Sequence, residues 1–167
     1  MSGDSATTVR PETDRLLCDL MLGKLVVYLR LCGYDTVYAG DREIEADDRI
    51  ASIARQENRR LCTRDTELAR RVSGAILLTE REVDAQLTEL RNAGVELEAA
   101  DPPAYCGRCN GRLGAMAPDA DSPEYAPDPA ETDCWRCRSC GQVFWKGSHY
   151  ERMAATIESA RSGDPVR

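Results

Sequence analysis

The sequence predicts an α/β fold: a mainly parallel sheet between two layers of helices, followed by a small cysteine-rich unit. Short apolar runs alternate four times with amphipathic helical segments, a pattern typical of a parallel sheet with helices on both faces. From residue 101 the composition changes, and the chain becomes rich in Gly, Pro and Cys. At 167 residues the chain is long enough for one main core and a minor appendage.

The individual elements follow from the hydrophobic pattern of each segment. Apolar runs predict strands at residues 15–19, 35–40, 59–63 and 74–79. Apolar residues at helical spacing predict helices at residues 20–33, 46–58, 66–72, 82–94 and 149–160. Gly33 is expected to end the first helix, because glycine adopts the left-handed conformation common at helix C-termini. Thr79 and Glu82 are expected to form a capping box that opens the helix at 82–94.

The charge and hydropathy of the chain limit its partners. It holds 22 basic and 29 acidic residues, and only Lys24 and Lys146 are lysines. This composition is typical of halophilic proteins, and a GC-rich genome is the alternative explanation. The negative net charge does not attract a polyanion, so a nucleic-acid site requires a local basic patch. Because no membrane span or secretory signal is present, we expect a soluble, cytoplasmic protein without a membrane partner.

The eight cysteines divide into two groups. Three stand singly inside apolar runs, where a thiol behaves as a small core residue: Cys18, Cys32 and Cys62. Two CxxC units, separated by 27 residues, have the spacing of a structural zinc site. The predicted ligands of one Zn²⁺ per chain are Cys106, Cys109, Cys137 and Cys140. Disulfides or free thiols are the alternative, and Cys134 is left out because its use would orphan Cys140.

These features divide the chain into four expected parts. Residues 1–13 are a disordered tail, and residues 14–100 form the α/β domain. Residues 101–150 form a zinc ribbon, in which a mobile loop rich in Pro, Asp and Ala occupies about 116–133. Residues 151–167 form a C-terminal helix and tail.

Acidic residues lie at the ends of the predicted strands. Asp19 follows the first strand, Asp65 follows the third, and Asp47 and Asp48 begin the helix after the second. Ligands of open parallel sheets bind beyond the carboxyl ends of the strands, so these carboxylates are expected to converge. Converging carboxylates repel one another unless a cation such as Mg²⁺ or Mn²⁺ neutralises them. The predicted catalytic metal ligands are Asp19, Asp47 and Asp65, with Asp48 and Glu67 as additional candidates.

Each acid also has a structural interpretation. The three aspartates at helix starts are favoured N-caps, and Glu67 fits a solvated helix face. Asp19 is harder to explain in this way, because it lies between apolar segments, where an unpaired carboxylate is costly. Thr63 either orients a ligand through its hydroxyl or is simply a β-favouring residue.

Basic and aromatic residues provide candidates for nucleic-acid contact. Residues 59–71 are the most basic segment, and guanidinium groups bind phosphate in a bidentate manner. The sequence "VFWKGSHY" combines aromatic and basic side chains, which suit stacking on unpaired bases. The candidates are Arg60, Arg64, Trp145 and Lys146. A solvated charged face, or packing of the ribbon on the sheet domain, is the alternative.

Four segments resemble successive motifs of one protein family: "LLCDLMLGKLVVYLRLCGYDT", "ADDRIASIARQENRRLCTRD", "YCGRCNGRL" and "WRCRSCGQVFWKGSHYERM". Over about residues 15 to 153 the chain is similar to the Mut-seven C-terminal RNase family, PIN-like nuclease domains with a C-terminal zinc ribbon. The chain departs from the family at Cys18, where an apolar residue is common, and at "CRSC", which lacks a proline.

The resemblance implies a PIN-like three-layer α/β/α domain and a metal-dependent ribonuclease that hydrolyses RNA phosphodiester bonds. It places Asp19, Asp47 and Asp65 on the positions that hold catalytic Mg²⁺ or Mn²⁺. The substrate is expected to be single-stranded RNA, and a homodimer would match other PIN-like domains. The alternative is a non-catalytic RNA- or protein-binding adaptor that uses the zinc ribbon. A Rossmann-type nucleotide binder is disfavoured, because no GxGxxG follows the first strand.

Overall fold

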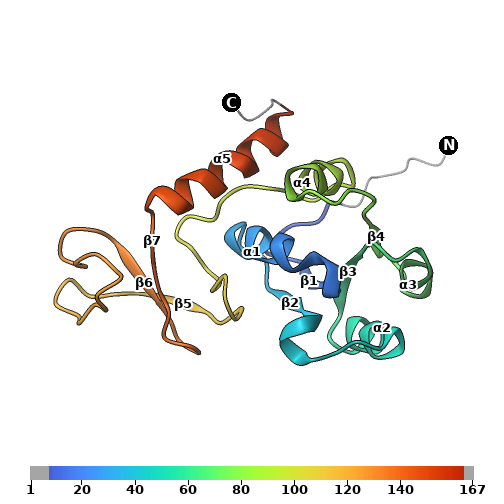
Figure 1. The fold of residues 1–167 in the computed structure, drawn as a ribbon, viewed down its shortest axis with the longest axis horizontal. Helices are drawn as coiled ribbons and strands as arrows, with labels where there is room; N and C mark the ends of the chain where they lie inside the picture. The colour runs from blue at the N-terminus through green and yellow to red at the C-terminus, as the bar shows by residue number, and fades with distance from the viewer. Residues whose placement is uncertain (1–7, 164–167) are drawn as a thin grey trace.

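The computed structural model describes residues 8–163 and confirms the predicted α/β fold (Figure 1). Within these residues, four parallel strands form the main sheet in the order β2-β1-β3-β4. Their bounds are β1 Arg15–Cys18, β2 Thr36–Tyr38, β3 Arg59–Thr63 and β4 Ile76–Leu77. Because β1 and β3 are the central pair, the residues that follow them occupy the middle of the carboxyl edge.

Helices follow the strands as predicted, with two short 3-10 helices in addition. The bounds are η1 Leu20–Leu22, α1 Gly23–Leu31, η2 Ala39–Arg42, α2 Asp47–Gln56, α3 Thr66–Arg71, α4 Val83–Asn92 and α5 Ser148–Ser162. Helices α1 and α4 cover one face of the sheet, with α5 packed against α4, and helices α2 and α3 cover the other face. In the described part of the chain, none of these helices has the length and apolar character needed to cross a membrane.

The side chains of β1 explain why the sheet is covered on both faces. Leu16 and Cys18 pack into one apolar core together with Leu29 of α1. Leu17 points the opposite way and packs into a second core with Ile50 of α2. All five side chains are at most 2% exposed. A strand buried on both faces is apolar at successive positions, as this one is.

The ends of two helices show one prediction that holds and one that fails. Gly33 ends α1 with a φ of 87°. The capping box of Thr79 and Glu82 is wrong: α4 begins at Val83, and Glu82 at the N-cap makes no side-chain cap hydrogen bond. Thr79 instead donates from its N–H and from its hydroxyl to Glu89, at 2.9 Å each. A carboxylate from within the helix therefore holds the preceding loop.

The N-terminal segment departs from the expected disordered tail where the structure describes it. Residues 1–7 lie outside the described part of the chain. Val9 is 1% exposed and forms a parallel bridge with Val95. Its N–H donates to Gly94 at 2.8 Å, and its carbonyl accepts from Glu96 at 2.9 Å. Backbone pairing and burial of one valine order a segment whose composition is otherwise polar.

The C-terminal unit is a small antiparallel sheet of order β5-β6-β7. Its strands are β5 Leu113–Ala115, β6 Cys134–Cys137 and β7 Val143–Trp145. The loop between β5 and β6 contains local hydrogen bonds, such as that from Ser122 to the carbonyl of Pro127 at 2.9 Å, and its mobility stays a prediction. From β7 the chain enters α5, which returns to the α/β domain and packs against α4 (Figure 1).

Candidate functional site

The first candidate site lies at the carboxyl edge of the parallel sheet. Asp19 directly follows β1 and is 6% exposed. Its Oδ1 accepts a hydrogen bond of 3.3 Å from the N–H of Met21, and its Oδ2 accepts one from the Thr63 hydroxyl. Asp19 forms no ion pair with any described Lys or Arg. This buried carboxylate is therefore held by neutral donors alone.

The surroundings of Asp19 disfavour its ionised form. Burial makes the largest contribution and raises the pKa of Asp19 above its ordinary value. Hydrogen bonds from Thr63 and Met21 act in the opposite direction, and the negative charges of Asp65 and Asp47 raise the pKa further. Those two carboxylates thus lie near enough to act on Asp19 through space.

Thr63 connects the ends of the two central strands. Cys18 and Cys62 are paired in register, which places Thr63 beside Asp19. The Thr63 hydroxyl donates to Asp19 and accepts a hydrogen bond of 2.9 Å from the N–H of Asp65. Of its two interpretations, the structure supports the one in which the hydroxyl orients a site residue. The sequence signal is a hydroxyl residue at a strand end, just before an aspartate.

Asp65 acts as a helix cap and retains a free oxygen. Its Oδ1 accepts hydrogen bonds from the N–H groups of Glu67 at 2.9 Å and Leu68 at 3.1 Å, which caps α3. Its Oδ2 has no hydrogen-bond partner among the described residues. Capping and metal ligation are therefore compatible at Asp65.

The structure separates the two adjacent aspartates of α2. Asp48 has a side chain that is 91% exposed and forms an ion pair of 2.6 Å with Arg71. Asp47 is half-buried, and its charge acts on Asp19. Asp47 is thus the member of the pair whose charge reaches the buried carboxylate, whereas Asp48 is paired with an arginine.

Glu67 lies away from this arrangement. Its side chain is 73% exposed and pairs with Arg70 at 3.1 Å on the same helix. A solvated carboxylate with an arginine partner needs no cation, so these contacts match the solvated-face interpretation.

The three aspartates at the edge are spaced more widely than the ligands of an enclosed ion. Within residues 8–163, the cysteine cluster is the only set of three or more Cys, His, Asp or Glu whose ligand atoms all lie within 4.8 Å. Asp19, Asp47 and Asp65 do not form a set that tight. Mg²⁺ usually binds through one or two carboxylates and keeps several waters, so it tolerates this wider spacing.

The two arginine candidates lie at opposite ends of β3. Arg64 directly follows the strand, at the same edge as the acids, and its buried Nε has no hydrogen-bond partner. Arg60 lies near the start of the strand, donates to the carbonyl of Gly74 at 2.9 Å and approaches Asp14 at 3.7 Å. The structure therefore brings Arg64, and not Arg60, to the acidic edge.

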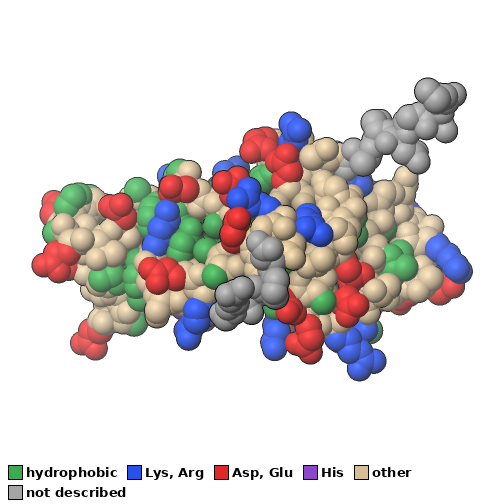
Figure 2. Space-filling view, turned by 90° about the horizontal axis from the view of Figure 1, so that it is seen from above, with side chains coloured by type: hydrophobic (Ala, Val, Ile, Leu, Met, Phe, Trp, Pro, Cys, Tyr) green, Lys and Arg blue, Asp and Glu red, His purple; other side chains and the backbone are tan. Residues whose placement is uncertain are grey.

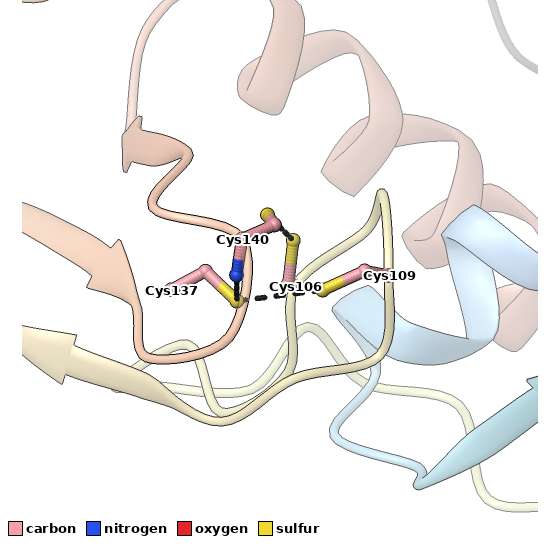
Figure 3. Close-up of side chains that lie close together, drawn as sticks. All are labelled: Cys106, Cys109, Cys137 and Cys140. Atoms are coloured by element: carbon pink, nitrogen blue, oxygen red, sulfur yellow. Dashed lines mark hydrogen bonds between the residues drawn. The ribbon is translucent and has the colours of Figure 1, made fainter.

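The second candidate site is the cluster of four cysteines (Figure 3). The sulfurs of Cys106 and Cys140 are 3.7 Å apart, and those of Cys109 and Cys137 are 3.5 Å apart. A tetrahedral Zn²⁺ with Zn–S bonds of about 2.3 Å holds its sulfurs about 3.8 Å apart. A disulfide requires about 2.0 Å, so the geometry excludes disulfides and can hold a structural metal such as zinc.

Backbone N–H groups point at two of these sulfurs. Ser139 and Cys140 each donate to Cys137 at 3.4 Å, and Gly111 donates to Cys109 at 3.4 Å. Burial opposes ionisation of Cys137, but these amides and the neighbouring thiols outweigh it and lower its pKa to about 7. The thiolate form that a metal requires is thus favoured at Cys137.

The remaining cysteines lie outside the cluster. The sulfur of Cys134 lies 3.4 Å from the carbonyl of Thr132 and 3.9 Å from that of Pro127. The other three are buried in the α/β domain: Cys18, Cys32 and Cys62.

Trp145 and Lys146 lie where the ribbon meets α5. The ring of Trp145 is 6.4 Å from that of Tyr125, centroid to centroid. The Lys146 ammonium forms an ion pair of 2.9 Å with Asp101 and lies 5.6 Å from the centre of the Tyr150 ring. These contacts belong to the ribbon junction and not to the acidic edge.

Arg30 and Asn110, which the sequence analysis did not single out, join the ribbon to the sheet. Asn110 accepts from the N–H of Thr36 at 2.9 Å and donates to Asp35 at 2.7 Å. Arg30 donates to the carbonyls of Gly107 and Thr36, at 3.0 Å each. Asn110 has a φ of 69°, which asparagine tolerates better than most residues. An asparagine next to a CxxC turn is the only sequence signal for this contact.

The fold and the two sites define a class: an α/β domain with carboxylates at the ligand-binding edge of a parallel sheet, joined to a four-cysteine ribbon. The family model described as "Mut7-C RNAse domain" matches residues 14–157, nearly the whole chain, and the protein belongs to this family. Membership indicates a nuclease-type function with RNA as the substrate. Comparison with curated proteins and with solved structures gave no match.

Proposed function

We propose that the protein is a metal-dependent ribonuclease that hydrolyses RNA phosphodiester bonds at the carboxyl edge of its sheet. One observation carries the proposal. Asp19 is a buried carboxylate without a basic partner, and its pKa is raised by burial and by the charges of Asp65 and Asp47. Acids whose pKa is raised at a ligand-binding edge are typical of functional sites.

The donors at this edge suit a hard divalent cation. Asp19, Asp47, Asp65 and the Thr63 hydroxyl offer only oxygen atoms, which Mg²⁺ and Mn²⁺ prefer. Such an ion lowers the pKa of bound water and stabilises charge on phosphate oxygens. The Thr63 hydroxyl fixes the orientation of Asp19, and Arg64, which directly follows β3 at the same edge, binds the phosphate group.

The ribbon has a structural role in this proposal and also contacts the substrate. Zn²⁺ held by the four cysteines fixes the ribbon, which docks on β2 through Asn110. Trp145 and Lys146 then present an aromatic ring and a positive charge to single-stranded RNA.

Cleavage of single-stranded RNA in the presence of Mn²⁺ tests the proposal. We expect Asp19→Asn and Asp65→Asn to lose activity by on the order of 100-fold or more, because each removes a charged metal ligand. Asparagine caps a helix as well as aspartate does, so Asp65→Asn keeps the start of α3. The matched controls are Asp48→Asn and Glu67→Gln, whose carboxylates form surface ion pairs, and both should retain activity.

Two outcomes would contradict this function. Equal cleavage by the wild type and the two site variants would show that the activity comes from a contaminant. Absence of cleavage with Mg²⁺ and with Mn²⁺, together with RNA binding that requires zinc, would indicate the non-catalytic adaptor instead. EDTA should abolish cleavage by the wild type.

A further inference from the structure

A cavity of about 340 Å³ lies where the ribbon, α5 and the second half of α1 meet. Its walls include Val27 and Leu31 of α1, Phe144 and Trp145 of β7, and Tyr150 in the first turn of α5. Cavities of about 300 to 1,000 Å³ at the interface of two structural units are typical ligand sites. None of the acidic residues of the carboxyl edge lines this cavity, so it is a separate site.

Aromatic rings form a large part of the wall. The four that line the cavity are Tyr105, Phe144, Trp145 and Tyr150. Tyr125, which does not line it, packs against the ring of Trp145 and supports it. Aromatic rings stack on nucleobases irrespective of the base sequence, because every base has a π-face.

The charges around the cavity favour an anionic partner. None of the described residues that line it is Asp or Glu, although the chain has 29 acidic residues. Arg112 lies 4.7 Å from the centre of the Tyr105 ring, and Lys146 lies 5.6 Å from that of Tyr150. The partner of Lys146 is Asp101, whose side chain is 77% exposed and can be displaced by a phosphate.

The surface of the ribbon, like the cavity wall, combines apolar side chains with charged ones. Figure 2 shows hydrophobic side chains gathered on the ribbon half of the molecule, with charged side chains around them. A flat apolar group that carries a neighbouring negative charge matches an aromatic wall with cations at its rings. A nucleobase with its phosphate has this chemistry.

Helix α1 connects the cavity to the acidic edge. The helix begins shortly after Asp19, and its second half carries Val27 and Leu31. Its nine residues span about 13 Å at 1.5 Å per residue. One RNA strand lying along α1 can therefore reach both sites.

We propose that this junction cavity binds one unpaired base of the RNA strand that is cleaved at the acidic edge. The inference rests on the proposed function for its substrate, and it defines the ribbon contact of that function as a cavity that holds one base. A base must leave its pair and its stack to enter a cavity, which costs free energy in a duplex and little in a single strand. The cavity thus gives a physical reason for preferring single-stranded RNA.

Equilibrium binding without Mg²⁺ or Mn²⁺ tests this site separately from catalysis. The full chain carrying Asp19→Asn is titrated, by fluorescence anisotropy, into single-stranded RNA, its duplex, and an abasic ribose-phosphate strand of equal length. We expect the single strand to bind about tenfold more tightly than either. Added Phe144→Ala and Tyr150→Ala should abolish this difference. Leu77→Ala, which shortens an exposed apolar side chain of β4 outside the cavity wall, should retain it.

The fluorescence of Trp145 provides a second measurement, which requires no substitution in the cavity wall. The chain has two tryptophans, so Trp135→Phe makes Trp145 the single indole. Single-stranded RNA and free nucleoside monophosphates should quench its fluorescence, whereas ribose phosphate should not. Equal affinity for all three strands with unchanged Trp145 fluorescence would overturn the cavity proposal, even if the wild type cleaves RNA. Base-dependent binding and quenching without cleavage would support the cavity and reject the catalytic function.

Discussion

Carboxylates at the two edges of the parallel sheet have pKa values that are shifted in opposite directions. At the amino edge, burial opposes ionisation of Asp35, but hydrogen bonds from Arg59 at 2.8 Å and Asn110 at 2.7 Å outweigh it and lower its pKa. At the carboxyl edge, burial raises the pKa of Asp19, and only the Thr63 hydroxyl and a backbone N–H donate to it.

Arginine accounts for this difference. Glu57, also at the amino edge, is hydrogen-bonded by Arg42 and Arg59, and its pKa falls to about 2. No described arginine forms an ion pair with Asp19 or Asp65 at the other edge. Carboxylates with a guanidinium partner stabilise the fold, whereas those without one raise the free energy until a cation or substrate binds.

The largest expected effect comes from substituting two cysteines of the cluster in the ribbon, which docks on the amino edge. Cys106→Ser combined with Cys140→Ser should eliminate one zinc per chain. The ribbon should also lose the folding free energy that such a site supplies, which is on the order of 10 kcal/mol. Elemental analysis and hydrogen exchange of β6 and β7 measure both losses. Cys134→Ser, outside the cluster, is the control and should keep its zinc. Full zinc in the double variant would refute the ligand assignment.

A divalent cation should stabilise the carboxyl edge by a smaller amount. At a concentration 100 times its Kd, Mg²⁺ or Mn²⁺ should stabilise the wild type by about 2.7 kcal/mol, because it binds the folded state only. Thermal unfolding with and without the ion measures this shift in Tm. Asp19→Asn should show no shift, and Asp48→Asn should match the wild type. An undiminished shift in Asp19→Asn would remove Asp19 from the site.

Substitution of Asn110 tests the contact between the ribbon and the amino edge. Asn110→Ala leaves the N–H of Thr36 without a partner and the carboxylate of Asp35 with Arg59 as its only side-chain donor, at a cost of about 1 to 3 kcal/mol. Alanine at a φ of 69° adds about 1 kcal/mol of strain. Asn110→Gly, which removes the side chain without the strain, should be the more stable variant in urea unfolding. Wild-type stability in both variants would mean that the contact contributes nothing.

Glu57 gives the smallest effect, and it depends on pH. Its folded pKa of about 2 is below the ordinary 4.5, so the stability that it contributes is fully present above about pH 4.5 and is lost as the pH falls through 2. Glu57→Gln should cost about 1 kcal/mol at neutral pH, and the difference from the wild type should vanish near pH 2. Acid titration of the unfolding free energy measures both. A difference that is constant across this range would exclude the charge as its cause.

Patterns within a few neighbouring residues were sufficient to predict much of the fold of this protein. The alternation of apolar runs predicted the strands, their parallel arrangement and the helices on both faces, because burial of β1 on both sides requires consecutive apolar residues. The two CxxC units predicted the cysteine cluster, because each pair of thiols is brought together by its own turn.

Partners that come from distant parts of the chain were decided by the tertiary structure alone. Asp47 and Asp48 are equivalent in sequence, and only the tertiary structure shows that the charge of Asp47 acts on Asp19 whereas Asp48 pairs with Arg71. The predicted capping box does not form, because Thr79 donates its hydrogen bonds to Glu89, a residue farther along the helix, and not to Glu82. Local sequence sets backbone preferences, but the free energy of a polar side chain depends on which donors and charges folding brings beside it.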